Sequence, residues 1–229
     1  RGAEPIRLNA QHVAWIAPRP RRQELVKALS GYPRTSRLER ARSFLFGECR
    51  MTNDLIVAQG VHFSYDGSSK VEALCGVDLR VRRGEYLVIL GRNGSGKSTL
   101  AKCLNGLLIP DRGDVYVNGI NTRHSEAGYA VRAMVGIVLQ NPDNQFVATT
   151  VEEEVAFGPE NLGLPCEELR SRVDEALALT GLLGLRQRSV RYLSAGEKAR
   201  LAVAGILAMR PQCLLLDEST AMLDPGARC

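Results

Sequence analysis

One glycine-rich octapeptide constrains this chain more than any other feature of its sequence. Residues Gly91 to Ser98 follow the pattern G-x-x-x-x-G-K-S, between the apolar run Tyr86 to Leu90 and a segment of helical character from Lys97 onward. A strand, loop and helix in this order direct backbone N–H groups and the positive end of a helix dipole toward one point. The sequence therefore predicts a phosphate-binding loop in an α/β domain.

Each residue type in this loop suits a nucleoside triphosphate. Gly94 and Gly96 allow the backbone to bend inward, and Lys97 supplies a mobile positive charge for the β- and γ-phosphates. Ser98 offers a hydroxyl oxygen to Mg²⁺. We therefore expect ATP and Mg²⁺ as the bound species. The remaining loop residues expected to contact the nucleotide are Gly91, Asn93, Ser95 and Thr99.

Two adjacent carboxylates follow a short apolar run near the end of the sequence. Residues 213–216 are Cys-Leu-Leu-Leu, bounded by Pro211 and by Asp217, as in a buried parallel strand. After a phosphate-binding loop, Asp217 is expected on the metal side and Glu218 as the general base that polarises the attacking water. By itself, a strand that ends in two acids would more often present surface carboxylates.

A third motif, Leu193-Ser-Ala-Gly-Glu197, begins a predicted helix. With it, residues 53 to 228 resemble the ABC ATPase family, whose motifs occur here in the family's order. The resemblance implies a P-loop NTPase fold with a parallel core sheet, an antiparallel β subdomain and a helical signature subdomain. It also implies that Ser194 and Gly196 bind the γ-phosphate held by an opposite subunit. Ser194 can equally act as an ordinary helix cap.

The same resemblance assigns roles to three further residues. Tyr65 matches the aromatic residue that stacks on adenine, and Gln140 the glutamine that reaches Mg²⁺ and senses a membrane partner. Asp224, in Ala221-Met-Leu-Asp224, completes the nucleotide-contacting set. Taken singly, an aromatic residue at a strand end would more often be a core residue, and a lone glutamine would mean little.

The sequence departs from the family pattern in two places. The usual signature is Leu-Ser-Gly-Gly-Gln, whereas this chain has Ala195 and Glu197; Gly196 keeps the position that most needs a bare backbone, so the class assignment is unchanged. The family's switch histidine follows the catalytic glutamate, but none of His12, His62 and His124 lies after Glu218. We therefore expect a C-terminally truncated ABC domain that is inactive by itself.

Residues 140–161 indicate a subgroup, because they resemble the energy-coupling factor (ECF) importers of vitamins and of cobalt or nickel ions. In that group this region receives a helix of a transmembrane subunit, and Phe146, Val147 and Phe157 would offer apolar docking surface. Alternatively, these side chains pack the helical subdomain. The implied partners are a second ATPase subunit, identical or paralogous, a transmembrane coupling subunit and a substrate-binding membrane subunit. The implied location is the cytoplasmic face of the membrane, as a peripheral subunit.

Two other classes share the nucleotide chemistry. An ATPase of DNA repair or chromosome organisation would need a long coiled-coil insertion, but Leu193 follows Lys97 by only 96 positions and this stretch shows no sustained heptads. A soluble P-loop NTPase of another type would lack the signature and Ala221 to Asp224. Nucleic acid is not an expected partner, because from Met51 onward there are 19 basic and 21 acidic residues.

Residues 1–50 differ from the rest of the chain. They hold 11 of its 30 basic residues and only 4 of its 25 acidic residues, with no sustained apolar period. We interpret residues 1–50 as a basic extension, with upstream sequence translated in frame as our hypothesis for its origin, and residues 51–229 as the ABC domain. A native basic tail and a targeting peptide are the alternatives. The six cysteines are scattered singly and are expected to be reduced thiols, mostly in packing positions.

The hydrophobic pattern predicts where regular structure lies. We expect strands at 55–65, 74–81, 85–90, 114–118, 135–140 and 213–216. We expect helices from Lys97 onward and at 151–157, 167–180 and 194–209.

Overall fold

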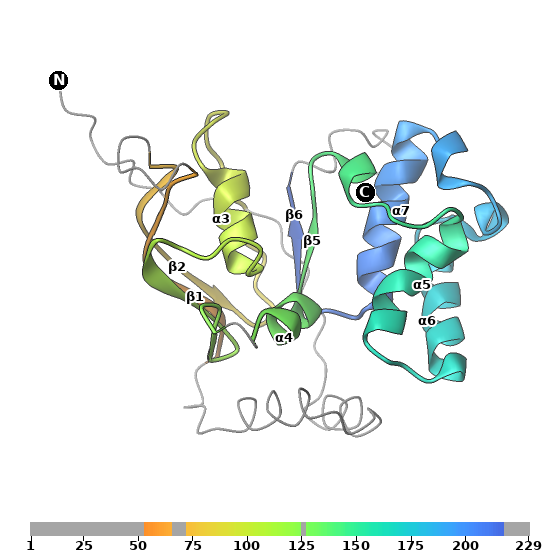
Figure 1. The fold of residues 1–229 in the computed structure, drawn as a ribbon, viewed down its shortest axis with the longest axis horizontal. Helices are drawn as coiled ribbons and strands as arrows, with labels where there is room; N and C mark the ends of the chain where they lie inside the picture. The colour runs from red at the N-terminus through yellow and green to blue at the C-terminus, as the bar shows by residue number, and fades with distance from the viewer. Residues whose placement is uncertain (1–52, 66–71, 125–126, 218–229) are drawn as a thin grey trace. The chain divides into compact units, whose positions relative to one another are not determined.

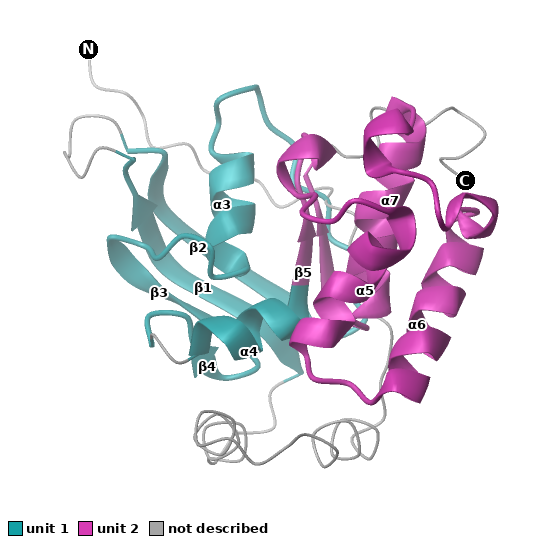
Figure 2. Cartoon of the chain, turned by 45° about the vertical axis from the view of Figure 1, so that its right-hand side comes forward, with its two compact units in different colours: residues 1–19, 34–135 teal, residues 20–33, 136–229 magenta. Residues whose placement is uncertain are grey.

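The computed structural model describes residues 53–65, 72–124 and 127–217. These residues belong to two compact units, coloured separately in Figure 2. The first comprises residues up to Val135 and the second begins at Gly136. Glu218 and Asp224, together with the predicted N-terminal extension and the boundary at Met51, lie outside the described residues.

The first unit contains an antiparallel sheet in the order β2-β1-β3-β4, whose strands β1 and β2 are labelled in Figure 1 and all four in Figure 2. Its strands are β1 (Asp54–Phe63), β2 (Leu74–Arg82), β3 (Arg112–Val117) and β4 (Ile120–Asn121). Strand β1 lies inside the sheet because it pairs with both β2 and β3, and its buried residues alternate with less buried ones, Ile56 and Ala58 and then Val61 and Phe63. The register shifts between Ala58 and Val61, where Gly60 has a φ of 55°. This bulge restores the apolar face after an interruption of the alternation.

Two helices complete the first unit, α3 (Lys97–Leu104) and α4 (Ala127–Met134). Helix α3 packs against β1 and β3 and buries Leu100, Cys103 and Leu104. Burial, with a smaller contribution from the charge of Asp111, raises the pKa of the Cys103 thiol to about 12. Helix α3 was predicted to begin at Lys97 and does so. Helix α4 was not predicted, because a segment of eight residues is too short for a clear helical period.

Apart from Val135, the first residue of β5, the second unit comprises a strand pair and three helices. Strand β5 (Val135–Val138) is hydrogen-bonded to β6 (Cys213–Leu216), and both are almost entirely buried. The N–H of Asp217 donates to the carbonyl of Val138 at 3.0 Å, so the C-terminal ends of the two strands meet. Strand ends meet in this way in a parallel pair. This agrees with the predicted parallel core sheet.

The helices of the second unit are α5 (Val151–Asn161), α6 (Cys166–Leu179) and α7 (Ala195–Ala208), which contact one another in every pair. Their shared core includes Val155, Leu177 and Leu201, all fully buried. Short 3-10 helices connect these elements. They are η1 (Pro142–Asn144), η2 (Leu183–Leu185) and η3 (Val190–Tyr192).

Helices were predicted at all three positions of the second unit, but one predicted strand of the chain is wrong. Residues 85–90 form no strand, since only Ile89 takes part in an isolated bridge and Tyr86 is 67% exposed. An apolar run favours burial, whereas a strand also needs a neighbour that pairs along its length. Strand β5 is also shorter than predicted, because it ends at Val138 instead of Gln140.

No helix among the described residues combines the length and the apolar character that crossing a bilayer requires. The cysteines that the structure describes are free thiols, and they divide by environment. Cys103 and Cys213 are buried, as predicted for packing residues, whereas Cys75 and Cys166 are exposed.

Candidate nucleotide-binding site

The phosphate-binding loop ends at a helix start that has no side-chain cap. Gly96 is the N-cap of α3 and has a φ of 85°, a conformation that suits glycine. A Cβ atom built at Gly96 would also lie 2.4 Å from the carbonyl oxygen of Ala73. Both facts require glycine here. Because no side chain caps the helix, its first turn can offer N–H groups to an anion.

The side chains of this loop also fit a phosphate group. The ammonium of Lys97 donates to the carbonyls of Gly91 at 2.9 Å and Arg92 at 3.1 Å, so it folds back over the loop. The hydroxyl of Ser95 is buried and has no hydrogen-bond partner in the structure. A buried hydroxyl without a partner is costly, and a phosphate oxygen is an acceptor that would satisfy it.

The predicted adenine-stacking residue lies beside the first turn of α3. The hydroxyl of Tyr65 is 3.1 Å from Oγ1 of Thr99, although the two residues are 34 positions apart. The ring meets Phe63 edge to face, with centroids 5.1 Å apart and an angle of 86° between the planes. It nevertheless remains 62% exposed. An anchored, exposed ring suits stacking on a flat base.

The signature sequence forms a capped helix start, as predicted for Ser194. The Ser194 hydroxyl accepts from the N–H of Glu197 at 3.3 Å, and the Glu197 carboxylate accepts from the N–H of Ser194 at 2.7 Å. These bonds form a capping box. The backbone N–H of Ser194 is the main reason that the pKa of Glu197 is lowered, followed by the Ser194 hydroxyl. Glu197, a departure from the family signature, therefore has a structural role.

Gln140 and Asp217 follow the two strands of the second unit. Asp217 comes directly after β6, and its N–H bonds to Val138, two positions before Gln140. The strand pair thus brings the backbones of these predicted metal-side residues to the same end of the sheet. Tyr65 and the phosphate-binding loop belong to the first unit, and Gln140, Asp217 and Ser194 to the second.

The loop after Gln140 is held by residues that the sequence analysis missed. The Gln145 amide accepts from the N–H of Leu139 at 2.8 Å and donates to the carbonyl of Ile137 at 3.1 Å. The Glu154 carboxylate accepts from the N–H groups of Val147 at 2.9 Å and Ala148 at 2.8 Å. No local sequence signal marks Gln145, because its partners are backbone groups.

The loop after Gln140 is also tied to the signature helix. The ammonium of Lys198 in α7 lies 2.6 Å from the carboxylate of Asp143 in η1. The ion pair thus links η1, which lies between Gln140 and Phe146, to the helix that begins at the signature.

The three predicted docking residues differ in environment. Val147 is 63% exposed and Phe157 is 47% exposed. Phe146 is partly buried and packs against both hydrophobic clusters of the second unit. The packing alternative is therefore correct for Phe146, whereas Val147 and Phe157 are available as surface.

The glycine N-cap of α3 and the Lys97 side chain folded over the loop are features of a phosphate-binding loop, and comparison with known proteins identifies the class. Residues 74–221 match the model of the family described as ABC transporter, so this chain belongs to that family.

Within the family, the chain is similar to the energy-coupling factor transporter ATP-binding protein EcfA1. It is 59% identical to the protein from Symbiobacterium thermophilum over 184 residues, which are 78% of this chain and 64% of that protein. The protein of the same name from Clostridium novyi is 51% identical over 181 residues, 78% of this chain and 64% of that protein. The chain thus spans somewhat less than two thirds of the length of these relatives.

Solved structures agree with this similarity. The structure of cbiO1 from Clostridium perfringens, described as part of the ABC transporter complex cbiONQ, is 38% identical and has a TM-score of 0.65, covering 77% of this chain and 70% of that one. A dimeric ATP-binding cassette, MJ0796, bound to ADP and Pi, is 28% identical with a TM-score of 0.66. It covers 75% of this chain and 77% of that one.

Proposed function

We propose that this chain is the ATP-binding subunit of an ECF-type importer and couples hydrolysis of MgATP to the uptake of a vitamin or of cobalt or nickel ions. The observation that carries the proposal is the uncapped start of α3 at Gly96, with the buried, unsatisfied hydroxyl of Ser95 in the same loop. Similarity to EcfA1 and to cbiO1 supports the choice of transporter.

In this proposal, different residues bind the phosphates and the adenine of ATP. N–H groups at the start of α3 and the Lys97 ammonium hold the β- and γ-phosphates, and the Ser95 hydroxyl donates to a phosphate oxygen. Tyr65 stacks on the adenine. For Lys97 to reach the nucleotide, it exchanges its bonds to the Gly91 and Arg92 carbonyls for bonds to phosphate oxygens, which carry more negative charge.

Hydrolysis is assigned to the residues at the end of the strand pair. Mg²⁺, when bound, would neutralise charge on the phosphates, and the family resemblance assigns Ser98, outside the strand pair, together with Gln140 and Asp217 as the residues that would hold it. Their hydroxyl, amide and carboxylate oxygens are the ligand types that this ion prefers. Glu218 then takes a proton from the attacking water. The family resemblance also assigns Asp224 a place beside the nucleotide, and Gly196 with Ser194 a contact to the γ-phosphate held by a second ATPase subunit.

Coupling to the membrane runs through the loop after Gln140. Gln145 ties this loop to the backbone of Ile137 and Leu139, and Glu154 holds the N–H groups of Val147 and Ala148, so Val147 is presented from a fixed loop. A fixed apolar side chain loses little entropy when a partner covers it. The partners are a transmembrane coupling subunit and a substrate-binding membrane subunit, which place this chain peripherally at the cytoplasmic face of the membrane.

Assembly of the full-length protein with its membrane subunits tests this function. Val147→Asp and Phe157→Asp should each reduce co-purification of the coupling subunit, because a buried unpaired charge is costly at an interface. The affinity for MgATP should not change. Phe146→Asp is a poorer test, since it would also disturb the core that this side chain joins.

Leu179→Asp is the matched control, because Leu179 is an apolar residue of the same unit and is 71% exposed. It should leave assembly intact. If the two docking variants assemble and transport as well as the control does, the docking role of this surface is wrong.

A further inference from the structure

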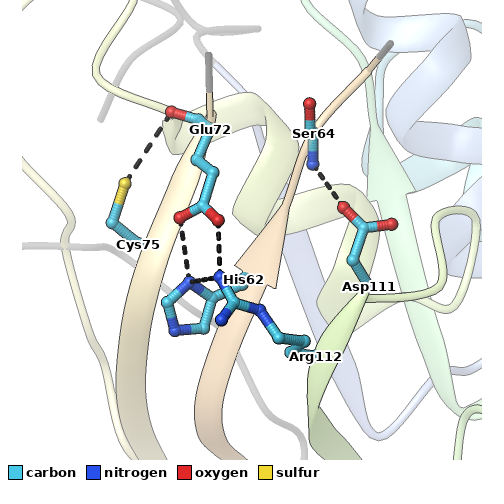
Figure 3. A network of polar contacts seen from close by, with 6 residues as sticks. All are labelled: His62, Ser64, Glu72, Cys75, Asp111 and Arg112. Carbon is cyan, nitrogen blue, oxygen red and sulfur yellow. Dashed lines mark hydrogen bonds and ion pairs between the residues drawn. The ribbon is translucent and has the colours of Figure 1, made fainter. Parts of the chain in front are cut away.

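The strand that ends near Tyr65 is tied down by residues outside the phosphate-binding loop. Asp111, which directly precedes β3, makes two of these bonds. Its carboxylate accepts from the N–H of Ser64 at 2.7 Å (Figure 3), and its own N–H donates to the carbonyl of His62 at 2.9 Å. Asp111 thus forms hydrogen bonds with the backbone of His62 and of Ser64, just before Tyr65.

A second set of contacts fixes the same strand end from the side. The Glu72 carboxylate bridges Nδ1 of His62 at 2.9 Å and the guanidinium of Arg112 at 2.6 Å (Figure 3). Ala73 also donates to the carbonyl of Phe63 at 2.8 Å. These contacts bring together β1, β2 and β3 at one point of the sheet.

The bond between Asp111 and Ser64 is the contact of this group nearest in sequence to Tyr65. It joins a carboxylate to a backbone N–H, which is stronger than a bond between neutral groups. Ser64 is buried, so the loss of this acceptor would disturb the backbone of its neighbour Tyr65. The ring of Tyr65 would then lose its fixed position against Phe63 and Thr99.

We propose that Asp111 is a positioning residue that holds Tyr65 in place for the base of the nucleotide and so determines how much the base adds to affinity. The inference rests on the proposed function, in which Tyr65 stacks on adenine and the loop from Gly91 to Ser98 holds the phosphates. Asp111 affects the contact between Tyr65 and adenine and leaves the contacts between the loop and the phosphates unchanged. It thereby separates recognition of the base from recognition of the phosphates.

Calorimetric titration of the full-length protein with MgATP and with magnesium tripolyphosphate, which has no base, tests the inference. Asp111→Ala should weaken MgATP binding roughly three- to tenfold, the scale of one lost hydrogen bond that positions an aromatic contact. The Kd for tripolyphosphate should stay within about twofold, because the phosphate contacts remain. Asp111→Asn keeps an acceptor oxygen and should restore most of the MgATP affinity.

Two further variants make the test specific. In a Tyr65→Ala background, Asp111→Ala should have no additional effect on MgATP, since the two residues act in sequence. Asp114→Ala is the matched control, because Asp114 also lies at β3 but bonds to Asn121 and Arg123. It should leave the ratio of the two Kd values unchanged.

Three outcomes would overturn the inference. One is an equal loss of affinity for both ligands in Asp111→Ala, which would indicate a general structural role. Another is an undiminished effect in the Tyr65→Ala background. The third is an unchanged MgATP affinity in Asp111→Ala while Tyr65→Ala weakens it. Failure of the wild-type protein to bind either ligand would instead contradict the proposed function. If Asp111→Ala does not fold, Asp111→Ser, with a shorter acceptor, should give the same selective loss.

Discussion

Helices α3 and α7 both begin at a motif predicted to contact phosphate, yet their first turns are built differently. Gly96 provides α3 with no side-chain cap, whereas Ser194 and Glu197 cap α7 from both directions. The start of α3 is therefore prepared for an anion from outside. At the start of α7, the N–H groups of Ser194 and Glu197 already donate to side chains of the cap, and the Glu197 carboxylate lies beside them.

This difference shows how one physical feature serves two purposes. The positive end of a helix attracts phosphate, but the same N–H groups also stabilise the helix when a side chain accepts from them. In α3, the N–H groups remain available for an anion, and the helix is stabilised by packing against β1 and β3. In α7, the local cap adds to the stability that core packing gives the helix, and contact with a partner's phosphate must coexist with it. Four predictions test this comparison.

The largest effect is expected at α3. Lys97→Ala should raise the Kd for MgATP about 100-fold or more, because charge-assisted bonds to phosphate are lost at a helix start that has no side-chain cap. Titration with a fluorescent ATP analogue measures it. Lys102→Ala, in the last turn of the same helix, is the control and should bind normally. Equal affinity of the Lys97 variant and wild type would place the nucleotide elsewhere.

A smaller effect is expected from the cap of α7. Ser194→Ala should lower the free energy of unfolding by about 1 kcal/mol, since a capping hydroxyl is lost. Urea denaturation measures this change. Ser189→Ala is the matched control, because Ser189 is the N-cap of η3 and its side chain makes no capping bond. If both variants are as stable as wild type, the cap contributes nothing to the free energy of unfolding.

A substitution at Glu197 can separate the effect of the negative charge of the cap from the effect of its hydrogen bonds. Glutamine can also complete a capping box, so Glu197→Gln should preserve the helix while removing a negative charge from the signature. In the assembled transporter, we expect ATP turnover to rise about two- to fivefold, as repulsion of the partner's phosphate is relieved. A steady-state phosphate-release assay tests this. Turnover at or below the wild-type rate would show that the carboxylate does not oppose the phosphate.

The smallest effect concerns pH. Helix α5 also begins with a capping box, between Thr150 and Glu153. The pKa values of Glu197 and Glu153 are both lowered from 4.5, chiefly by backbone hydrogen bonds. A lowered pKa in the folded state means that the unfolded state binds protons more readily. The stabilisation is therefore present above pH 4.5 and is lost as the pH falls through the folded-state values.

Urea-unfolding midpoints measured between pH 6 and pH 3 should show this loss. The decline should be shallower for Glu153→Gln and Glu197→Gln combined than for wild type. Parallel curves for the two proteins would mean that other groups control acid stability.

Much of the site could be predicted because its motifs are local. The glycines of the loop, the start of α3 at Lys97 and the cap at Ser194 depend on residues within a few positions of each other. The family resemblance then assigned a role to Tyr65, which the structure places beside Thr99. The wrong strand at 85–90 and the missed helix α4 show the limit of reading periodicity in short segments.

The sequence by itself thus determined the chemistry of this protein, since a phosphate-binding loop and its helix require particular residues at fixed local spacing. Only the tertiary structure decided which distant residues support that chemistry. Gln145 holds the strand before Gln140, Asp111 reaches Ser64 across 47 positions, and Phe146 faces the core. Each of these contacts joins side chains to backbone or to packed neighbours, and such pairings depend on how the chain folds, so no pattern of adjacent letters records them.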